Sequence, residues 1–140
     1  MAITEHPKTG SIVICDFNTG FREPEMCKIR PVMVLSPKIA SRHHLCTVVT
    51  LSTTAPDPIM PYHRQIDLDP VLPPKYRSQG IWIKGDMVNA VGFHRLNLIF
   101  DGKNNNKRNY LYEGQIEENI KIARQCVLRA LGMSVLTKHM

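Results

Sequence analysis

Two proline-rich segments in the middle of this 140-residue chain restrict its fold more than any other feature. Residues 53–61 (TTAPDPIMP) hold three prolines, and a second segment carries Pro70, Pro73 and Pro74. Proline breaks a helix and lacks the N–H that a central strand must donate. We therefore expect both segments to be rigid links at the surface and the elements around them to be short.

Runs rich in β-branched residues predict strands on either side of these links. The predicted strands are 11–17, 30–36, 46–52, 62–68, 81–93 and, after a turn at 101–107, 108–112. The runs 30–36 and 46–52 are continuously apolar, which is typical of strands buried on both faces. Residues 18–29 are polar and predict a long connecting loop. Gly85 and Gly92 allow a bulge or a sharp bend inside the run 81–93.

Only the C-terminal part of the chain has the pattern of a helix. Its apolar residues recur at steps of three and four, and they are Ile116, Ile120, Ala123, Val127 and Leu131. Short strands joined by Pro and Gly turns and closed by one amphipathic helix are typical of a mainly β (α+β) protein. We predict a single domain over residues 1–140, a small and strongly bent antiparallel barrel with the helix packed on it.

Composition and charge narrow the functional classes. No stretch approaches the ~18 apolar residues of a membrane helix, and the N-terminus lacks the apolar run of a secretion signal. The chain has 18 Lys and Arg against 12 Asp and Glu, and residues 71–112 hold seven of these bases but only two of the acids. We therefore expect a cytoplasmic protein, not attached to a membrane, with a basic surface that suits a polyanion.

The cysteines and histidines show no metal-site pattern. Cys15, Cys27, Cys46 and Cys126 have no C-x-x-C spacing and lie mostly in apolar runs, as reduced core thiols do. No standard catalytic signature occurs either. We expect no metal and no cofactor, so any chemistry has to come from polar side chains at strand ends and loops.

Arg30 directly precedes a buried strand, so its guanidinium is expected to emerge at the rim of the sheet. There its planar fork can hold a phosphate. An ion pair with Glu23 or Glu25 of the preceding loop is the simpler interpretation, and the residues alone favour it.

Two further groups of polar residues are candidates. Ser52, Thr53 and Thr54 end a predicted strand together, where hydroxyls either bind phosphate oxygens or, more commonly, satisfy the backbone of a turn. Lys84 and Asp86 are two apart in a predicted strand, so they are expected to share one face as a catalytic pair or as a surface ion pair. His63 is the histidine best placed for proton transfer, although base rates favour a solvent-facing role.

The order of several strings resembles one protein family. GSIVICDF, KIRPVMVLSP, CTVVTLSTTAP, PYH and WIKGD follow one another as in the MazF/PemK (Kid) family of toxins from bacterial toxin–antitoxin pairs. The chain is most similar to the YifN-type PemK-like branch, in which PEM-x-K-x-RPV and LSTT-x-P recur. The resemblance extends from about Gly10 to Gly132.

This resemblance implies both a fold and a reaction. The fold is a small Src-homology-3-like barrel of the MazF/PemK/CcdB type, usually a homodimer held inactive by a cognate antitoxin. The reaction is metal-independent cleavage of single-stranded RNA, such as mRNA, by attack of the ribose 2′-OH on its own phosphate. The products are a 2′,3′-cyclic phosphate and a 5′-OH end. Such cleavage needs a proton acceptor, cationic or hydrogen-bonding groups for the phosphorane charge, and an acid.

The resemblance also assigns roles position by position. Arg30 falls on the arginine of the RP motif and is expected to hold the phosphate and to supply the acid. The hydroxyl that follows the next strand falls on Ser52 or Thr53, and both stay open. Lys84 and Asp86 fall on the Arg-x-Asp pair of Kid-like members, but a lysine lacks the bidentate fork of arginine.

The first loop also departs from Kid-like members, because it has no histidine. The general base therefore stays open between Asp86 and Glu25. The residues expected to contact RNA are Arg22, Glu25, Lys28, Thr54, His63, Arg77 and Trp82.

Two alternatives to an RNA-cleaving enzyme remain at this point. Related toxins with the same barrel poison gyrase by binding it, without catalysis. A relative that binds nucleic acid without cutting it is the other alternative, and the lysine at position 84 motivates it.

Overall fold

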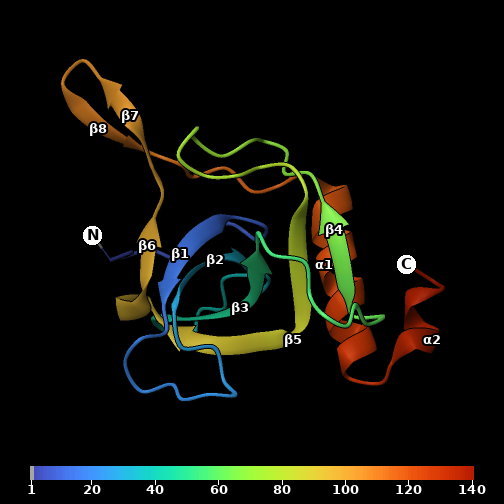
Figure 1. Ribbon diagram of the computed structural model, residues 1–140. Helices are drawn as coiled ribbons and strands as arrows, with labels where there is room; N and C mark the ends of the chain where they lie inside the picture. The colour runs from blue at the N-terminus through green and yellow to red at the C-terminus, as the bar shows by residue number, and fades with distance from the viewer. Residues whose placement is uncertain (1) are drawn as a thin grey trace.

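The chain folds into a bent, six-stranded antiparallel sheet with a helix packed against it (Figure 1). The computed structural model describes residues 2–140. The strands are β1 (Ile12–Asp16), β2 (Ile29–Val34), β3 (Leu45–Ser52), β4 (His63–Ile66), β5 (Ile81–Gly92) and β6 (Leu96–Leu98), in the sheet order β4-β5-β3-β2-β1-β6. The helix α1 spans Glu117–Ala130. In the described chain β4 and β6 do not pair with each other, so the barrel is open along one seam.

β5 bends sharply in its first half, beside α1, and Figure 1 shows its two halves at a steep angle. The pairing of β5 with β3 changes register next to Thr50, which lies opposite Lys84. Gly85 lies in this change, and a Cβ atom there would stand 2.4 Å from the Cys126 carbonyl oxygen of α1. Because no larger residue permits this approach, Gly85 fixes the bend that its sequence position predicted.

Each face of the sheet has its own core. The cluster between the sheet and α1 includes Met33, Val49, Leu51, Ile83, Ile120 and Ala123. The cluster on the other face includes Val13, Val32, Val34, Val48 and Leu96. The predicted strands 30–36 and 46–52 contribute to both clusters, which confirms that they are covered on both faces.

The helix is confirmed, but its predicted apolar stripe is wrong at both ends. Ile120 and Ala123 are buried against the sheet, as expected. Ile116 is 44% exposed and Leu131 is 62% exposed, because the first precedes α1 and the second follows it. Cys126 completes the buried face instead. Within residues 2–140, no helix has the length and apolar character needed to cross a membrane.

The segment predicted as a turn at 101–107 is mostly a hairpin. β7 (Phe100–Asn104) pairs with β8 (Lys107–Tyr110), and the hairpin projects from the body of the molecule (Figure 1). Its turn is only Asn105 and Asn106, with φ of 52° and 64°, a conformation that asparagine tolerates better than most residues. The strand predicted at 108–112 is thus confirmed as β8, shifted by one residue at its start and ending two residues earlier. β7 is exposed throughout, so it lacks the apolar alternation that marks a half-buried strand. The short β6 and the single-turn helix α2 (Ser134–Thr137) were not predicted either.

Candidate active site

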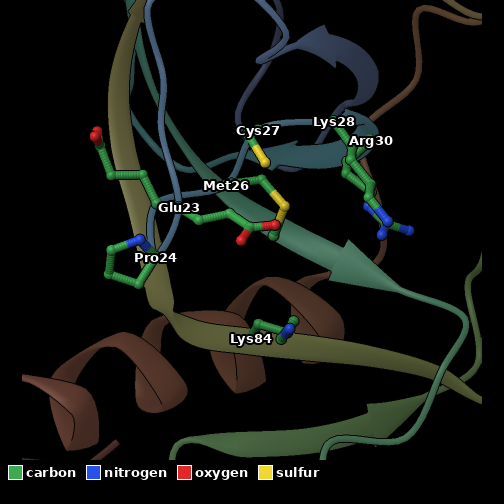
Figure 2. Close-up of a pocket in the computed structure, with 8 residues that line it drawn as sticks. Glu23, Pro24, Met26, Cys27, Lys28, Arg30 and Lys84 are labelled. Carbon is green, nitrogen blue, oxygen red and sulfur yellow. The ribbon is translucent and has the colours of Figure 1, made fainter.

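Arg30 and Lys84 line one open hollow of about 550 Å³, although they come from different strands (Figure 2). The loop between β1 and β2 forms the rest of its wall, with Glu23, Pro24, Glu25, Met26, Cys27 and Lys28. We call this the cation hollow, because three cationic side chains and two carboxylates surround it. The cationic side chains can bind an anionic group, and a carboxylate beside them can accept a proton from the same ligand.

The strand register explains why these side chains meet. Val32 lies opposite Thr50, Thr50 opposite Lys84, and Lys84 opposite His63 on four neighbouring strands. Partners that lie directly opposite in a sheet place their side chains on the same face. Arg30 precedes Val32 by two residues on β2, so it emerges on that face as well. The bent sheet thus places Arg30, Thr50, Lys84 and His63 on one face, although they come from four different strands.

Arg30 makes no ion pair within residues 2–140, so the simpler interpretation of this residue is wrong. Its Nε atom is buried and has no hydrogen-bond partner. Glu25 accepts a long hydrogen bond of 3.4 Å from the Arg22 backbone N–H instead. A buried guanidinium nitrogen without a hydrogen-bond partner lowers the stability of the folded protein, and a bound anion would supply the missing partner. Arg30 is therefore a candidate for binding an anion.

The hydroxyl groups behave differently from one another. Ser52 Oγ donates to the Thr54 carbonyl at 3.2 Å and accepts from the Thr54 N–H at 3.1 Å, so it satisfies a turn as the simpler interpretation expects. Thr53 is exposed. Thr50 was not predicted as a site residue, yet its fully buried Oγ1 has no partner. Only the register next to Lys84 reveals it, because in the sequence Thr50 is simply one member of an apolar strand.

His63 is buried, with 8% of its surface exposed, so its expected solvent-facing role is wrong. Its Nδ1 accepts a hydrogen bond of 3.0 Å from the Met60 N–H, and its Nε2 lies 3.7 Å from Asp86 Oδ1. This arrangement directs the proton of the ring toward the carboxylate. Asp86 therefore pairs with His63 and not with Lys84, and it does not line the cation hollow.

The residues predicted to contact RNA fall into two groups. Glu25 and Lys28 line the cation hollow, and Arg22 lies on the same loop. Arg77 lies elsewhere, at a smaller cavity beyond the end of β3 that Ser52 and Thr53 also line. Thr54 follows this strand end, and Trp82 pairs with Ser52 across β3 and β5.

Thiol chemistry offers a test of the hollow's accessibility. Burial raises the pKa of Cys15 to about 12 and the pKa of Cys46 and Cys126 to about 11, so at pH 8 these thiols are neutral and inert. Cys27 is only partly buried and lines the hollow. Iodoacetamide should therefore modify Cys27 at least about tenfold faster than the other three. Peptide mass spectrometry of the folded protein measures this, and equal rates at all four cysteines would contradict it.

Comparisons with known proteins agree on one family. Residues 8–119 match the family described as PemK-like, MazF-like toxin of type II toxin-antitoxin system. No curated protein sequence matches the chain.

Solved structures show the same fold. MazF from Deinococcus radiodurans superposes with a TM-score of 0.61 at 19% identity, covering 92% of this chain and 99% of that one. An endoribonuclease from Mycobacterial species, in complex with its cognate antitoxin, superposes with a TM-score of 0.57 at 18% identity, covering 91% of this chain and 97% of that one. Mycobacterium tuberculosis toxin MazF-mt6 superposes with a TM-score of 0.54 at 15% identity, covering 87% of this chain and 96% of that one. These likenesses confirm the predicted fold class, and the family match, which spans most of the sequence, shows that the chain belongs to the PemK-like, MazF-like toxins of type II toxin-antitoxin systems.

Proposed function

We propose that this toxin is a metal-independent endoribonuclease that cleaves single-stranded RNA at the cation hollow. The observation that carries the proposal is the partly buried, unpaired guanidinium of Arg30 beside Lys84. Two cations placed before any ligand arrives can stabilise the charge of a pentacoordinate phosphorane without reorganising. The names of the similar structures, endoribonuclease and MazF, support this reaction.

Each residue then has a definite role. Arg30 holds the scissile phosphate with its fork and protonates the leaving 5′-oxygen, while Lys84 adds a second positive charge. The exposed Thr53 hydroxyl at the end of β3 can donate to a phosphate oxygen, whereas Ser52 can do so only by giving up its bond to the Thr54 carbonyl. The 2′-oxygen forms a bond to phosphorus as the bond from phosphorus to the 5′-oxygen breaks, which gives the 2′,3′-cyclic phosphate.

Glu25 is the better candidate for the general base. It lines the cation hollow together with Arg30 and Lys84, within reach of a substrate bound there. Asp86 instead faces His63 at 3.7 Å. We propose that the contact between His63 of β4 and Asp86 of β5 holds the part of β5 that carries Lys84 in position.

We further propose a cytoplasmic homodimer whose cognate antitoxin covers the cation hollow. Similar toxins have been solved in complex with an antitoxin, which supports this partner. An antitoxin segment with acidic side chains would complement the three cationic groups of the hollow.

Incubating the purified toxin with a 5′-labelled single-stranded RNA in excess EDTA tests the reaction. We expect cleavage with a 2′,3′-cyclic phosphate on one fragment and a 5′-OH on the other. A single 2′-deoxy substitution at the cut should block cleavage there, because the nucleophile is missing. Intact RNA would contradict the proposal, and tight RNA binding or inhibited gyrase supercoiling would then identify which non-cleaving alternative holds.

A further inference from the structure

The hairpin β7–β8 carries a concentrated positive charge that the reaction proposed above does not use. Its cations are Lys103, Lys107 and Arg108, against one acid, Asp101. All residues of β7 are exposed, and so are those of β8 up to Asn109. Because the hairpin projects from the body of the molecule (Figure 1), these charges can reach a partner that extends beyond the sheet.

The register of the hairpin places two aromatic rings and two cations on one side. Phe100 lies opposite Tyr110, and Lys103 lies opposite Arg108. Arg108 and Tyr110 are two apart in β8, so both pairs point the same way. The Arg108 guanidinium carbon lies 4.6 Å from the centre of the Phe100 ring and 5.9 Å from that of Tyr110, and the two rings meet edge to face at 6.2 Å. We call this side the stacking face, on which Phe100 stays 38% exposed.

A cavity of about 440 Å³ lies at the foot of the hairpin. It is lined by residues 2–8, Ser11, Leu98, Tyr110 and Tyr112, so Tyr110 belongs to both the cavity and the stacking face. Ser11 is only 2% exposed, and its Oγ has no hydrogen-bond partner among residues 2–140. A polar ligand atom in the cavity would supply that partner. The cavity therefore offers a buried hydrogen-bonding group directly beside the stacking face.

The strand register shows how far this surface lies from the cation hollow. Arg30 lies opposite Cys15 on β1, and Cys15 lies opposite Leu96 on β6. β6 then leads toward the other end of β1 and into Phe100. Two strand spacings and the rise from Leu96 to Phe100 separate Arg30 from Phe100 by roughly 16 Å. At about 3.4 Å per stacked nucleotide this is about five nucleotides, so only an RNA longer than its cut site reaches both.

We propose that the stacking face and the cavity at its foot bind a second stretch of the same single-stranded RNA, outside the cut. Exposed rings stack with bases of any sequence, and cations between them hold the phosphates. The charge alone would also attract an acidic protein, but rings interleaved with cations match a nucleic acid strand better. This inference rests on the proposed function, because it names which RNAs the toxin selects, those with a single-stranded flank.

Binding of 2′-O-methyl RNA, measured by fluorescence anisotropy, tests this surface separately from catalysis. The methyl group blocks the nucleophile at every position, so the probe stays intact wherever the cut falls. The two probes have about five nucleotides and about four times that length. The unmodified toxin should bind the longer probe at least about tenfold more tightly. Lys103→Ala, Lys107→Ala and Arg108→Ala combined should abolish this gain, and the slope of log K against log salt for the longer probe should fall by about 2.

Two further variants separate stacking and hydrogen bonding from charge. Phe100→Ala should weaken binding of the longer probe roughly 5- to 100-fold without changing its salt dependence. Ser11→Ala should weaken it about 2- to 10-fold, the contribution of one hydrogen bond. Both should bind the short probe as the unmodified toxin does. The matched control combines Lys121→Ala, Arg124→Ala and Lys138→Ala, which remove the same charge from α1 and the segment after it and should leave the gain unchanged.

Each outcome separates this inference from the proposed reaction. Equal affinities for the two probes, or a gain that survives loss of the three hairpin cations, would overturn the inference even if the toxin cuts RNA normally. A gain that depends on the hairpin, in a toxin that cuts no RNA, would support the inference and reject the ribonuclease. Release of the longer probe by poly-glutamate as readily as by unlabelled RNA would also overturn it, because such a surface would suit an acidic protein instead.

Discussion

Replacing Arg30 with alanine should lower the rate of RNA cleavage by at least about 100-fold, a typical cost of removing one preorganised donor from a transition state. The fold should survive this change. Arg30 makes no ion pair among the described residues, and its buried Nε has no partner, so truncation removes an unsatisfied group. The melting temperature should therefore stay the same or rise. Single-turnover cleavage and thermal melting of the same preparation measure both effects.

Arg124→Ala is the matched control for Arg30→Ala. It removes the same charge from the surface of α1, where Arg124 pairs loosely with Glu117 at 3.6 Å, and exposed pairs contribute little. Cleavage by this variant should be unchanged. Arg30→Lys keeps the charge without the fork and should recover only part of the activity. Cleavage by Arg30→Ala within a fewfold of the unmodified rate would show that the phosphate is held elsewhere.

Gly85→Ala should destabilise the protein by about 2–3 kcal/mol, at the upper end for an overpacked site. The new Cβ would stand 2.4 Å from the Cys126 carbonyl oxygen, which is backbone and cannot rotate away. Either α1 lifts from the sheet or β5 loses its bend, and both displace Lys84. We expect the melting temperature to fall by roughly 5–10 °C, with weaker cleavage at temperatures where the variant is still folded.

Gly102→Ala provides the comparison for Gly85→Ala. Gly102 lies in the exposed β7 with φ of 80°, and nothing approaches its missing Cβ within 4 Å. Alanine at this φ should cost only about 1 kcal/mol. Calorimetry on both variants separates the steric effect from the loss of a glycine. Equal losses of stability would mean that the contact with α1 does not determine the bend.

Much of the fold could be predicted from the sequence because its signals are local. The proline links, the apolar runs of β2 and β3 and the helical spacing of α1 each lie within a few consecutive residues. The returning strand predicted at 108–112 overlaps β8, but β7 was missed because all its residues are exposed and thus carry no apolar pattern. Similarly, Ile116 and Leu131 fit a helical stripe by spacing, but α1 ends before it reaches either of them.

The candidate site was less predictable because it depends on contacts between distant strands. Arg30 and Lys84 could be selected from the sequence, since each adjoins an apolar run that predicts a strand. Thr50 could not be selected, and the burial of His63 could not be predicted, because both depend on which strands pair and in which register. The pairing of His63 with Asp86 has the same origin. A local pattern cannot report which strands become neighbours.

The projecting hairpin β7–β8 is the part of the chain that can be lengthened with the least effect on the rest of the fold. The Leu111 N–H donates to the Ile99 carbonyl at 2.9 Å, so the chain leaves the body and returns to it at adjacent points. Lengthening such an excursion costs mainly loop-closure entropy, about 0.6 kcal/mol for each doubling. The tip at Asn105 and Asn106 is therefore a suitable place to insert an epitope or a fluorescent reporter, since an added segment there pulls on neither the sheet nor α1.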